Sequence, residues 1–443
     1  MQRRALVRAI EEEIGDRNLV WVGLRGDDAE PLSDLRQFRS AFSLLSAYDR
    51  RVDVKFRAYE DLSGVRVDPE IWDIDDHLTA PATNAFRQEL LRALTSASVV
   101  VPYRPSQFLS AVLFARSTFC RPLGLFGALQ SAFEHKPWVE TAVSRLGLPR
   151  VPWRYVADEE QVTAASMFRD GPLMLRRSRT SGGEGLVRVD GPEELAAQWP
   201  KIDEAFASVS PYIEGGIPVN VGGVVWADGV TVHHASIQLI GIAHLVTRPF
   251  GYCGNDFGAV RELSGAVINE IDVAVRAVGA WLGQHGFRGA FGIDFLVHEG
   301  HALFLEVNPR FQGSTHASAQ LDAEAGESCL MLEHVAAWLD LPAPEAKPLR
   351  ETVENTPDFA HLVTHWPGEP ARLDVTPLTS ALRAMPTTAR IELEPPDAIV
   401  CERGAAALRW TARQRVTTTG YDLLPDVTGL DSRLVALRGG RED

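Results

Sequence analysis

The sequence predicts an α/β protein with additional α+β lobes, and three stretches carry this prediction. Residues 19–24, LVWVGL, form an apolar run that ends in Gly-rich polar sequence, as the first strand of a parallel α/β unit does. Residues 172–190 place a glycine-rich loop between two apolar stretches, which indicates strand, loop and strand. Residues 290–308 alternate apolar and polar side chains on both sides of Gly300, which is typical of a β-hairpin.

The first 130 residues are predicted to form a small N-terminal α/β domain. The chain begins with the spacing of an amphipathic helix, and apolar runs then alternate with helical patterns. The expected elements are helix 1–15, strand 19–24, helix 85–96, strand 98–102, helix 108–116 and a short strand within 122–126.

The middle of the chain is predicted to hold two further units. Residues 131–211 should form a lid subdomain, with a helix at 135–147 and the strand–loop–strand at 172–190. Residues 212–341 should form the main catalytic subdomain. Its expected elements are short strands within 209–240, a helix at 265–285, the hairpin at 290–308 and a helix at 327–340.

The last part of the chain is predicted to be a separate small lobe. Residues 342–349, PAPEAKPL, are rich in proline and have the composition of a linker. Short strand patterns follow, in ARIELE, AIVCE and ALRWTA. We therefore expect residues 350–443 to fold as a small α+β or β-rich C-terminal lobe.

Composition excludes several classes of protein. The chain has 443 residues, 45% of them hydrophobic, with a net charge of −15 and no run of basic residues. This acidity disfavours a nucleic-acid-binding protein. No stretch of about 18 apolar residues occurs, so no membrane span is expected. The four cysteines lack metal-ligand spacing, which favours a reduced, cytoplasmic protein with cysteines in its core.

The hairpin at 290–308 is the most informative stretch. Apolar side chains occupy odd positions on both of its strands, and opposed residues of a hairpin share a face. A loop with an odd number of residues keeps these apolar sets together, so we expect the three-residue loop Glu299–His301. In an unbroken ladder, a two-residue loop would place apolar residues opposite polar ones, so we do not expect it. Asp294 should then lie opposite Glu306.

Asn308 lies two positions beyond Glu306 and should share its face. Two carboxylates and an amide oxygen would converge there, and Mg²⁺ prefers such oxygen ligands. The sequence therefore predicts Asp294, Glu306 and Asn308 as ligands of one or two Mg²⁺ ions, with Mn²⁺ as a substitute. Taken alone, the same pattern also fits a hairpin with a wet polar face.

The segment 172–189, PLMLRRSRTSGGEGLVRV, contains a candidate phosphate loop. Glycine lets backbone N–H groups approach phosphates closely, and the strand–loop–strand context differs from a Walker loop. Ser181, Gly182 and Gly183 are the candidate loop residues, although a GGEG sequence alone is also a simple turn. Lys136 is one of four lysines among 44 basic residues and opens a predicted helix, where a surface lysine is the alternative.

These motifs together resemble the ATP-grasp superfamily. GIDF at 292–295 followed by EVNPRFQGST at 306–315 is similar to the metal-binding end of that family. The resemblance implies that Asp294, Glu306 and Asn308 hold Mg²⁺ between the ATP phosphates. It also implies that Arg310 contacts phosphate or a developing acyl phosphate.

The resemblance extends to the nucleotide-binding residues. Lys136 precedes Gly147 by the family's spacing, and Arg176-Arg177 stands where the family has Lys-Pro. The segment 209–221, VSPYIEGGIPVNV, is similar to the adenine hinge, which implies backbone contacts from Tyr212 and Ile213. The implied nucleotide ligands are Lys136, Arg176, Ser181, Gly182, Gly183, Tyr212, Ile213, Glu214 and Asn220.

Substrate residues are predicted less directly. The loop 248–258, RPFGYCGNDFG, offers Arg248, Asn255 and Asp256 to a carboxylate or an amine, and a plain connecting loop is the alternative. Arg310 and Arg248 are the candidate catalytic residues. Ser314 and His316 follow the metal strand and are candidates for the acceptor pocket, whereas His233 and His234 are expected to be structural.

The implied activity is that of an ATP-dependent ligase. It would join a carboxylate to an amine through an acyl phosphate and release ADP and phosphate. We place it in the peptide-ligase branch, similar to ligases of specialised-metabolite pathways such as the pheganomycin type, where antibiotic-like peptides are made. The alternatives are a carboxylase-like or purine-pathway ligase and a non-catalytic ATP-binding subunit. The expected partners are small-molecule or peptide substrates, without nucleic acid or membrane, and a homodimer is compatible with the sequence.

Overall fold

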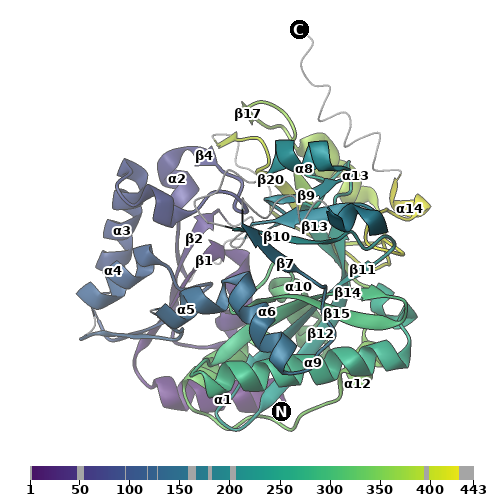
Figure 1. Cartoon of the computed structure of the whole chain (residues 1–443). Helices are drawn as coiled ribbons and strands as arrows, with labels where there is room; N and C mark the ends of the chain where they lie inside the picture. Colours follow the sequence, from purple (N-terminus) through teal and green to yellow (C-terminus); the bar gives the residue numbers. More distant parts are fainter. Residues whose placement is uncertain are drawn as a thin grey trace.

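The computed structural model describes residues 2–46, 54–94, 96–116, 118–126, 128–157, 166–177, 182–199, 206–393 and 399–428. Within these ranges the strands form four sheets, and helices cover the larger ones (Figure 1). No helix among the described residues is long and apolar enough to cross a membrane. The four cysteines are buried and unpaired, as the sequence suggests.

The N-terminal domain is a parallel five-stranded sheet with strand order β3-β2-β1-β5-β6. Strand β1 is buried over most of its length because helices cover both faces, and this explains its continuous apolar run. Strands β2 and β5 flank β1, so the strand order reverses there. The strands are β1 (Asn18–Arg25), β2 (Phe38–Leu45), β3 (Lys55–Ala58), β5 (Ser98–Pro102) and β6 (Cys120–Pro122). The helices are α1 (Arg3–Ile14), η1 (Asp27–Asp34), α2 (Tyr59–Ser63), η2 (Ile74–His77), α3 (Pro81–Ala93) and α4 (Gln107–Ala115).

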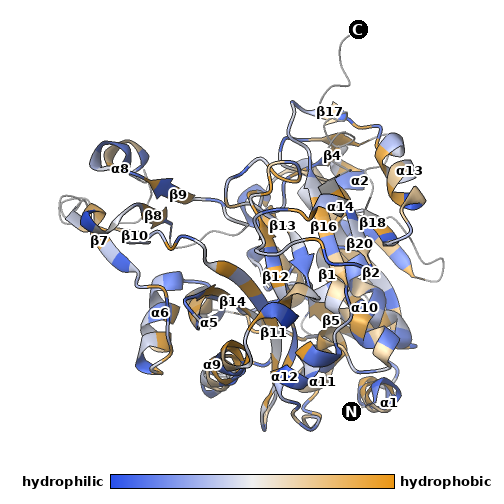
Figure 2. Cartoon of the chain, turned by 90° about the vertical axis from the view of Figure 1, so that its right-hand side faces the viewer, coloured by the Kyte–Doolittle hydropathy of each residue, from blue (hydrophilic) through white to orange (hydrophobic). Residues whose placement is uncertain are grey.

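A four-stranded antiparallel sheet, in the order β7-β10-β8-β9, forms the lid subdomain. Figure 2 shows this sheet and helix α8 standing away from the main body. The strands are β7 (Arg154–Ala157), β8 (Leu173–Arg176), β9 (Leu186–Val189) and β10 (Phe206–Pro211). The associated helices are α5 (Ala128–Phe133), α6 (Lys136–Arg145), η4 (Ser166–Asp170) and α8 (Pro192–Gln198).

An eight-stranded sheet, in the order β15-β14-β11-β12-β13-β16-β20-β18, is the centre of the molecule. Helix α9 packs on one face of β11, and α11 packs on the other face. The strands are β11 (Ile217–Val225), β12 (Val230–Ile240), β13 (Tyr252–Asp256), β14 (Gly289–His298), β15 (His301–Asn308), β16 (Ala360–His365), β18 (Thr388–Leu393) and β20 (Ala406–Ala412). The helices are η5 (Ala259–Glu262), α9 (Gly265–Gln284), α10 (Thr315–Ala325), α11 (Leu330–Trp338), α12 (Leu349–Asn355), α13 (Thr376–Ala384) and α14 (Pro425–Thr428).

The C-terminal segment differs from the separate lobe that we expected over 350–443. Its strands β16, β20 and β18 extend the central sheet, because β16 pairs with the otherwise open edge of β13. A small sheet, β17-β19-β4, also joins this segment to the N-terminal domain. Its strands are β4 (Val65–Arg66), β17 (Ala371–Arg372) and β19 (Val400–Cys401).

Buried ion pairs reinforce this assembly. Arg409 of β20 is fully buried and contacts Asp27 and Asp28 of η1, with 3.2 Å between nitrogen and oxygen in each pair. Arg25 of β1 is also 3.2 Å from Asp28. Removing one partner of such a network would leave an uncompensated buried charge, which is costly. The C-terminal segment is therefore part of the framework that positions the N-terminal domain.

The turn of the β14–β15 hairpin corrects one prediction. His298 pairs with His301, so the turn holds two residues, Glu299 and Gly300. Both have positive φ angles, 49° and 80°, which is the geometry of a type I′ turn. The expected three-residue loop Glu299–His301 was wrong.

A β-bulge explains why the two-residue turn is compatible with the sequence. The register shifts between Asp294 and Phe295, so Leu305 is an extra residue on β15. One extra residue on one strand changes whether odd-numbered residues pair with odd-numbered or with even-numbered ones. The predicted loop assumed a ladder without a bulge. Beyond the bulge Asp294 faces Glu306, as predicted. Leu305 joins Glu306 on the polar face instead of entering the core.

Buried His334 ties α11 to its neighbours and makes stability depend on pH. Its Nδ1 accepts the N–H of Ala290 at 2.9 Å, and its Nε2 donates to the carbonyl of Leu123 at 2.9 Å. Burial lowers the pKa of His334 to about 4. Protonation of Nδ1 would also place a second donor against the Ala290 N–H.

We expect the free energy of unfolding to fall as the pH falls from about 6.5, the unfolded pKa, towards 4. In that window His334 is protonated in the unfolded chain but stays neutral in the folded one. The resulting loss in the free energy of unfolding is about 3 kcal/mol at most. Urea unfolding at several pH values measures it. His334→Gln should flatten the slope, whereas His301→Gln, at an exposed position, should leave it unchanged. Equal slopes for all three proteins would contradict the assignment.

Candidate functional site

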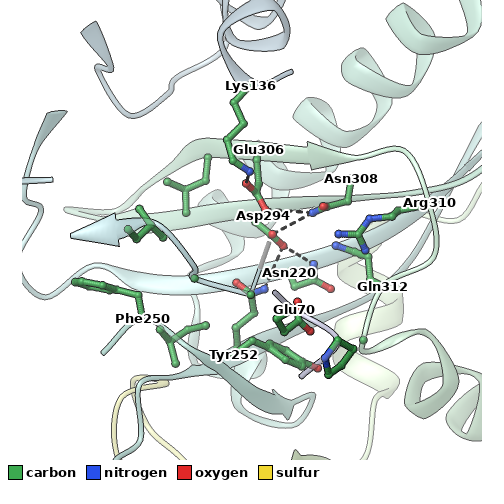
Figure 3. Close-up of a pocket in the computed structure, with 18 of the residues that line it drawn as sticks. Glu70, Lys136, Asn220, Phe250, Tyr252, Asp294, Glu306, Asn308, Arg310 and Gln312 are labelled. Atoms are coloured by element: carbon green, nitrogen blue, oxygen red, sulfur yellow. Dashed lines mark hydrogen bonds and ion pairs between the residues drawn. The ribbon is translucent and has the colours of Figure 1, made fainter. Parts of the chain in front are cut away.

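Two carboxylates face each other on the polar side of the β14–β15 hairpin. Asp294 lies opposite Glu306 on β15 and opposite Asn220 on β11. Asn220 Nδ2 donates to Asp294 Oδ1 at 2.5 Å, and Gln238 Nε2 donates to the same oxygen at 3.2 Å. Asn308 Nδ2 donates to Asp294 Oδ2 at 3.2 Å (Figure 3). Four strands, β11, β12, β14 and β15, thus direct polar side chains at one point.

The charges of this cluster are strongly coupled. Burial and the neighbouring Glu306 raise the pKa of Asp294. Burial alone would also raise the pKa of Glu306, but the ion pair with Lys136 outweighs burial and lowers it. Two buried carboxyl groups this close cannot both ionise unless a positive charge compensates them.

The donor set fits a hard divalent cation. Asp294 and Glu306 supply carboxylate oxygens, and half a turn of the Asn308 amide would present its oxygen as well. Mg²⁺ takes such ligands and completes its shell with water or substrate phosphates. These three residues are the ones that would hold the ion.

Cationic side chains reach the carboxylates from separate elements. Lys136, at the start of α6, extends to Glu306 (Figure 3). Arg176, at the end of β8, pairs with Glu140 of α6 and lies over the ring of Trp153 at 3.9 Å. The Nε atoms of Arg176 and the indole of Trp153 are buried and lack a hydrogen-bond partner among the described residues. Buried donors of this kind are expected to be satisfied by a ligand.

Arg310 follows the metal strand and is also buried in the site. Its Nη1 donates to Tyr103 Oη at 3.4 Å and to the Phe311 carbonyl at 3.1 Å. Figure 3 shows its guanidinium beside Asn308 and Gln312. Burial would lower its pKa, but Tyr103 and nearby carboxylates outweigh burial and raise it. Arg310 therefore remains a fixed positive charge at all physiological pH values.

The glycine loop lies over the cavity. Gly182 and Gly183 line it and have φ angles of 55° and 77°. A side chain at Gly183 would collide with the carbonyl oxygen of Phe250, and one at Gly182 would collide with Glu70. Both positions therefore require glycine for close packing. Ser181, the third predicted loop residue, lies outside the described residues.

An apolar part of the cavity, the apolar slot, lies between the lid sheet and the hairpin. Its walls are aromatic and aliphatic side chains of the kind that hold a planar base. The slot is lined by Trp153, Met174, Leu186, Tyr212, Ile213, Phe250, Leu296 and Leu305. Tyr212 and Ile213 thus lie where the sequence places the hinge. The Tyr212 N–H itself donates to the Pro172 carbonyl at 2.8 Å, so this amide is engaged within the protein.

Two other predicted residues lie in the same cavity. Asn255 is fully buried at its wall, where it donates to Ser236 Oγ at 2.9 Å and accepts from Tyr252. Ser314 also lines the cavity and donates to Asn220 Oδ1 at 3.0 Å. Both orient neighbours of the carboxylate cluster. The whole cavity encloses about 370 Å³, enough for an elongated small molecule.

Four predicted residues do not line the cavity. Glu214 is exposed beyond the hinge. Arg248 turns away to pair with Asp68 of the N-terminal domain, so the structure does not place it as a catalytic residue. Asp256 accepts the N–H groups of Ala259, Val416 and Thr417 and anchors the C-terminal segment. His316 is buried with its Nδ1 3.8 Å from Asp28.

Sequence reasoning missed several residues that line the cavity. Tyr103 directly follows β5, and its position could have been inferred, because ligands gather at the carboxyl ends of parallel strands. Gln312 lies two residues after Arg310, within the motif already recognised. Glu70, Gln238 and Tyr252 carried no local signal, since each reaches the cavity only through the packing of separate elements.

Comparison with known proteins agrees with this arrangement. Residues 146–314 match the family model of the ATP-grasp domain, a span that includes the glycine loop and the three metal-ligand candidates. Over this span the chain is similar to ATP-grasp domains. Its fold is the ATP-grasp fold, with a parallel-sheet N-terminal domain in front of the ATP-grasp subdomains.

Two similar proteins carry the same name. The chain is 26% identical over 290 residues to the formate-dependent phosphoribosylglycinamide formyltransferase of Azotobacter vinelandii, covering 62% of this chain and 67% of that protein. It is 24% identical over 309 residues to the enzyme of the same name from Nitratidesulfovibrio vulgaris, covering 64% and 72%.

Solved structures resemble the chain over nearly its full length. Carboxyaminoimidazole ribonucleotide synthase of Aspergillus clavatus, in complex with ATP, aligns with a TM-score of 0.58 and 15% identity over 95% of this chain and 98% of that one. The biotin carboxylase domain of Hydrogenobacter thermophilus 2-oxoglutarate carboxylase aligns with a TM-score of 0.60 and 12% identity, over 90% and 87%. At these identities the likeness shows a shared fold.

The close approach of the glycine loop to Phe250 generates a prediction for nucleotide binding. Gly183→Ala should weaken ATP binding at least about tenfold, because a Cβ there prevents the loop from reaching its position. Gly215→Ala is the control, since Gly215 has a similar φ of 70° but open space around it. Calorimetric titration with Mg-ATP measures both. Equal affinities for the two variants would show that backbone strain alone, rather than the loop contact, determines binding.

Proposed function

We propose that this protein is an ATP-dependent ligase that activates a carboxylic acid as an acyl phosphate and joins it to an amine. The observation that carries the proposal is the convergence of Asp294, Glu306 and Asn308 with Lys136 and Arg310 beneath a glycine loop. The buried Nε of Arg176 and the indole N–H of Trp153 have no partner among the residues that the structure describes, which supports a nucleotide in that space.

The chemistry follows from this arrangement of charge. The acid's carboxylate oxygen attacks the γ-phosphorus of ATP, and the bond to the ADP oxygen breaks. When bound, Mg²⁺ neutralises charge on the transferring phosphoryl group. Lys136 and Arg310 provide fixed positive charge on either side of the carboxylate pair. The glycine loop and the apolar slot exclude water, which would otherwise hydrolyse the acyl phosphate.

Amide formation completes the reaction. The amine nitrogen attacks the acyl carbon, phosphate leaves with the electrons of the C–O bond, and the nitrogen loses a proton. Arg310, as a buried permanent cation, stabilises the oxyanion that forms on the acyl oxygen. No nucleophilic side chain is required, because the acyl group is transferred from phosphate directly to the amine.

The similar proteins favour one of the alternatives above over the peptide-ligase branch. The named relatives are purine-pathway formyltransferases that depend on formate, and one structural neighbour was solved with bicarbonate. None of these is a peptide ligase. A one-carbon acid, formate or bicarbonate, is therefore the first acid to test, and a purine-pathway ligase is the second candidate function.

The decisive experiment measures the products formed from ATP. The protein is incubated with Mg-ATP and formate, bicarbonate or pooled amino acids, with and without pooled amines, and ADP, AMP and phosphate are quantified. We expect ADP and phosphate only when an acid and an amine are both present. AMP would instead indicate adenylation and overturn the acyl-phosphate route. Tight nucleotide binding without turnover in any mixture would favour the non-catalytic ATP-binding alternative.

Glu306→Gln tests the metal assignment directly. The variant keeps the shape of the side chain but removes one of two charges that would hold the ion, so turnover should fall by at least about a hundredfold. Glu299→Gln, in the exposed turn of the same hairpin, should keep full activity. The unfolding midpoint of both variants should match the parent protein. Full activity of Glu306→Gln would exclude Glu306 as a metal ligand.

A further inference from the structure

The part of the cavity formed by the N-terminal domain is apolar. It lies at the carboxyl ends of β1 and β5, where the strand order of the parallel sheet reverses. Ligands of open α/β sheets bind at this position. The apolar residues that line it are Leu24, Trp72, Ile74, Phe86, Phe108 and Leu109.

Aromatic contacts hold this apolar wall in shape. The rings of Phe86 and Phe108 stack with centroids 5.7 Å apart and planes inclined by 20°. Tyr59 lies behind them, 5.0 Å from the ring of Trp72 and 6.2 Å from that of Phe86. Trp72 and Ile74 are only partly buried, although they pack against this cluster. Apolar side chains that face an open cavity favour an apolar occupant, since binding removes their surface from water.

The N-terminus of helix α4 lies at this cavity but is not free to bind a phosphate. A helix N-terminus binds anions only when its N–H groups are free. The N–H groups of Gln107 and Phe108 instead donate to the Asp75 carboxylate at 2.7 and 2.9 Å. The N–H of Leu109 donates to Ser106 Oγ at 3.1 Å. A phosphate would have to displace a carboxylate that is already in place.

The turn after β1 is equally unsuited to a phosphate. This is the position at which many nucleotide-binding sheets place a glycine-rich loop and a helix N-terminus. Here the first turn of η1 carries the buried carboxylates of Asp27 and Asp28. Their charge is compensated within the protein by Arg25 and Arg409. Carboxylates therefore occupy the N-termini of both η1 and α4, which follow β1 and β5.

The polar groups on this wall favour an amine over an acid. Glu70 and Asp73 contribute carboxylates to the cavity, and Arg104 contributes a guanidinium that pairs with Asp73. Glu70 also acts on the nearby cation of Arg310, so both arginines already face carboxylates. An acid would compete with these carboxylates for the arginines, whereas an amine can donate its N–H groups to carboxylate oxygens that are already in place.

We propose that the amine substrate is a primary amine with an aryl or branched alkyl group, which this apolar wall receives, and that it carries no phosphate. The inference rests on the proposed ligase function and specifies its amine. It also distinguishes this chain from its relatives, whose names specify phosphoribosyl substrates.

Binding of simple probes tests the proposal without knowledge of the acid. The intact protein with Mg-ADP is titrated with 2-phenylethylamine, ethanolamine and ribose 5-phosphate by calorimetry. We expect 2-phenylethylamine to bind at least about tenfold more tightly than ethanolamine, because its ring buries apolar surface. Tighter binding of ribose 5-phosphate than of 2-phenylethylamine would overturn the proposal and favour a purine-pathway substrate.

Matched variants locate the binding. Ile74→Gln should weaken 2-phenylethylamine at least about tenfold, since Ile74 lines the cavity, and Leu24→Gln on β1 should act in the same direction. Ile71→Gln is the control, because Ile71 is 58% exposed and does not line the cavity. Thermal unfolding verifies that each variant is folded. An equal effect of the Ile71 and Ile74 variants would refute the proposed location.

The two proposals can fail separately. ADP formation that is as rapid with ethanolamine as with 2-phenylethylamine would support the ligase and overturn the apolar amine site. Binding of 2-phenylethylamine that is sensitive to Ile74→Gln, without nucleotide turnover with any acid, would support the apolar site and overturn the ligase.

Discussion

The site depends on two carboxylates, those of Asp294 and Glu306, which face each other on neighbouring antiparallel strands. The sheet fixes their separation, and burial removes the water that would screen them. Positive charge must therefore be supplied, and Lys136 supplies it from the lid side of the molecule. A cation bound between the carboxylates would take over that role and free the lysine for a phosphate. The charge on one glutamate is thus coupled to the position of helix α6 and of the lid behind it.

The remainder of the molecule provides a rigid frame for that pair. The N-terminal sheet, α11 and the central sheet share one apolar core, and Arg409 joins the C-terminal segment to Asp27 and Asp28. The lid sheet has a small core of its own and stands apart from the body (Figure 2). The apolar cluster that joins the lid sheet to the hairpin lines the cavity, so a movement of the lid would change the cavity and leave the sheet that carries the carboxylates intact.

Local sequence patterns were sufficient to predict which carboxylates of the cavity face each other. Alternation along one hairpin placed Asp294 opposite Glu306, and the structure confirms that pairing. The loop of the same hairpin was mispredicted, because a bulge at Leu305 changes the pairing parity without leaving a periodic signal. Helices at 136–145 and 265–284 were anticipated within a few residues, since each carries its own amphipathic spacing.

Features that arise from tertiary assembly could not be predicted in this way. The C-terminal strands carried the expected strand patterns, but their partner, the edge of β13, is a distant segment that no local pattern identifies. Arg248 lies in a glycine-rich loop that suggested substrate binding, yet its partner is Asp68, 180 residues away in sequence. Tyr252 and Glu70 reach the cavity only because three units pack around it.

This division has a consequence for function within the superfamily. The nucleotide end, the part of the cavity around Asp294, Glu306 and the glycine loop, is built from the lid sheet, helix α6 and the central sheet. The other end is a surface between domains, assembled from β1, β5, α3, α4 and the segment around Trp72. A few substitutions there change the substrate without touching the carboxylate pair. Asp75 at the start of α4, and Asp27 and Asp28 after β1, place carboxylates where a phosphate-binding sheet presents free N–H groups. Similarity to purine-pathway enzymes at the nucleotide end is therefore compatible with an amine substrate of a different chemical class at the other.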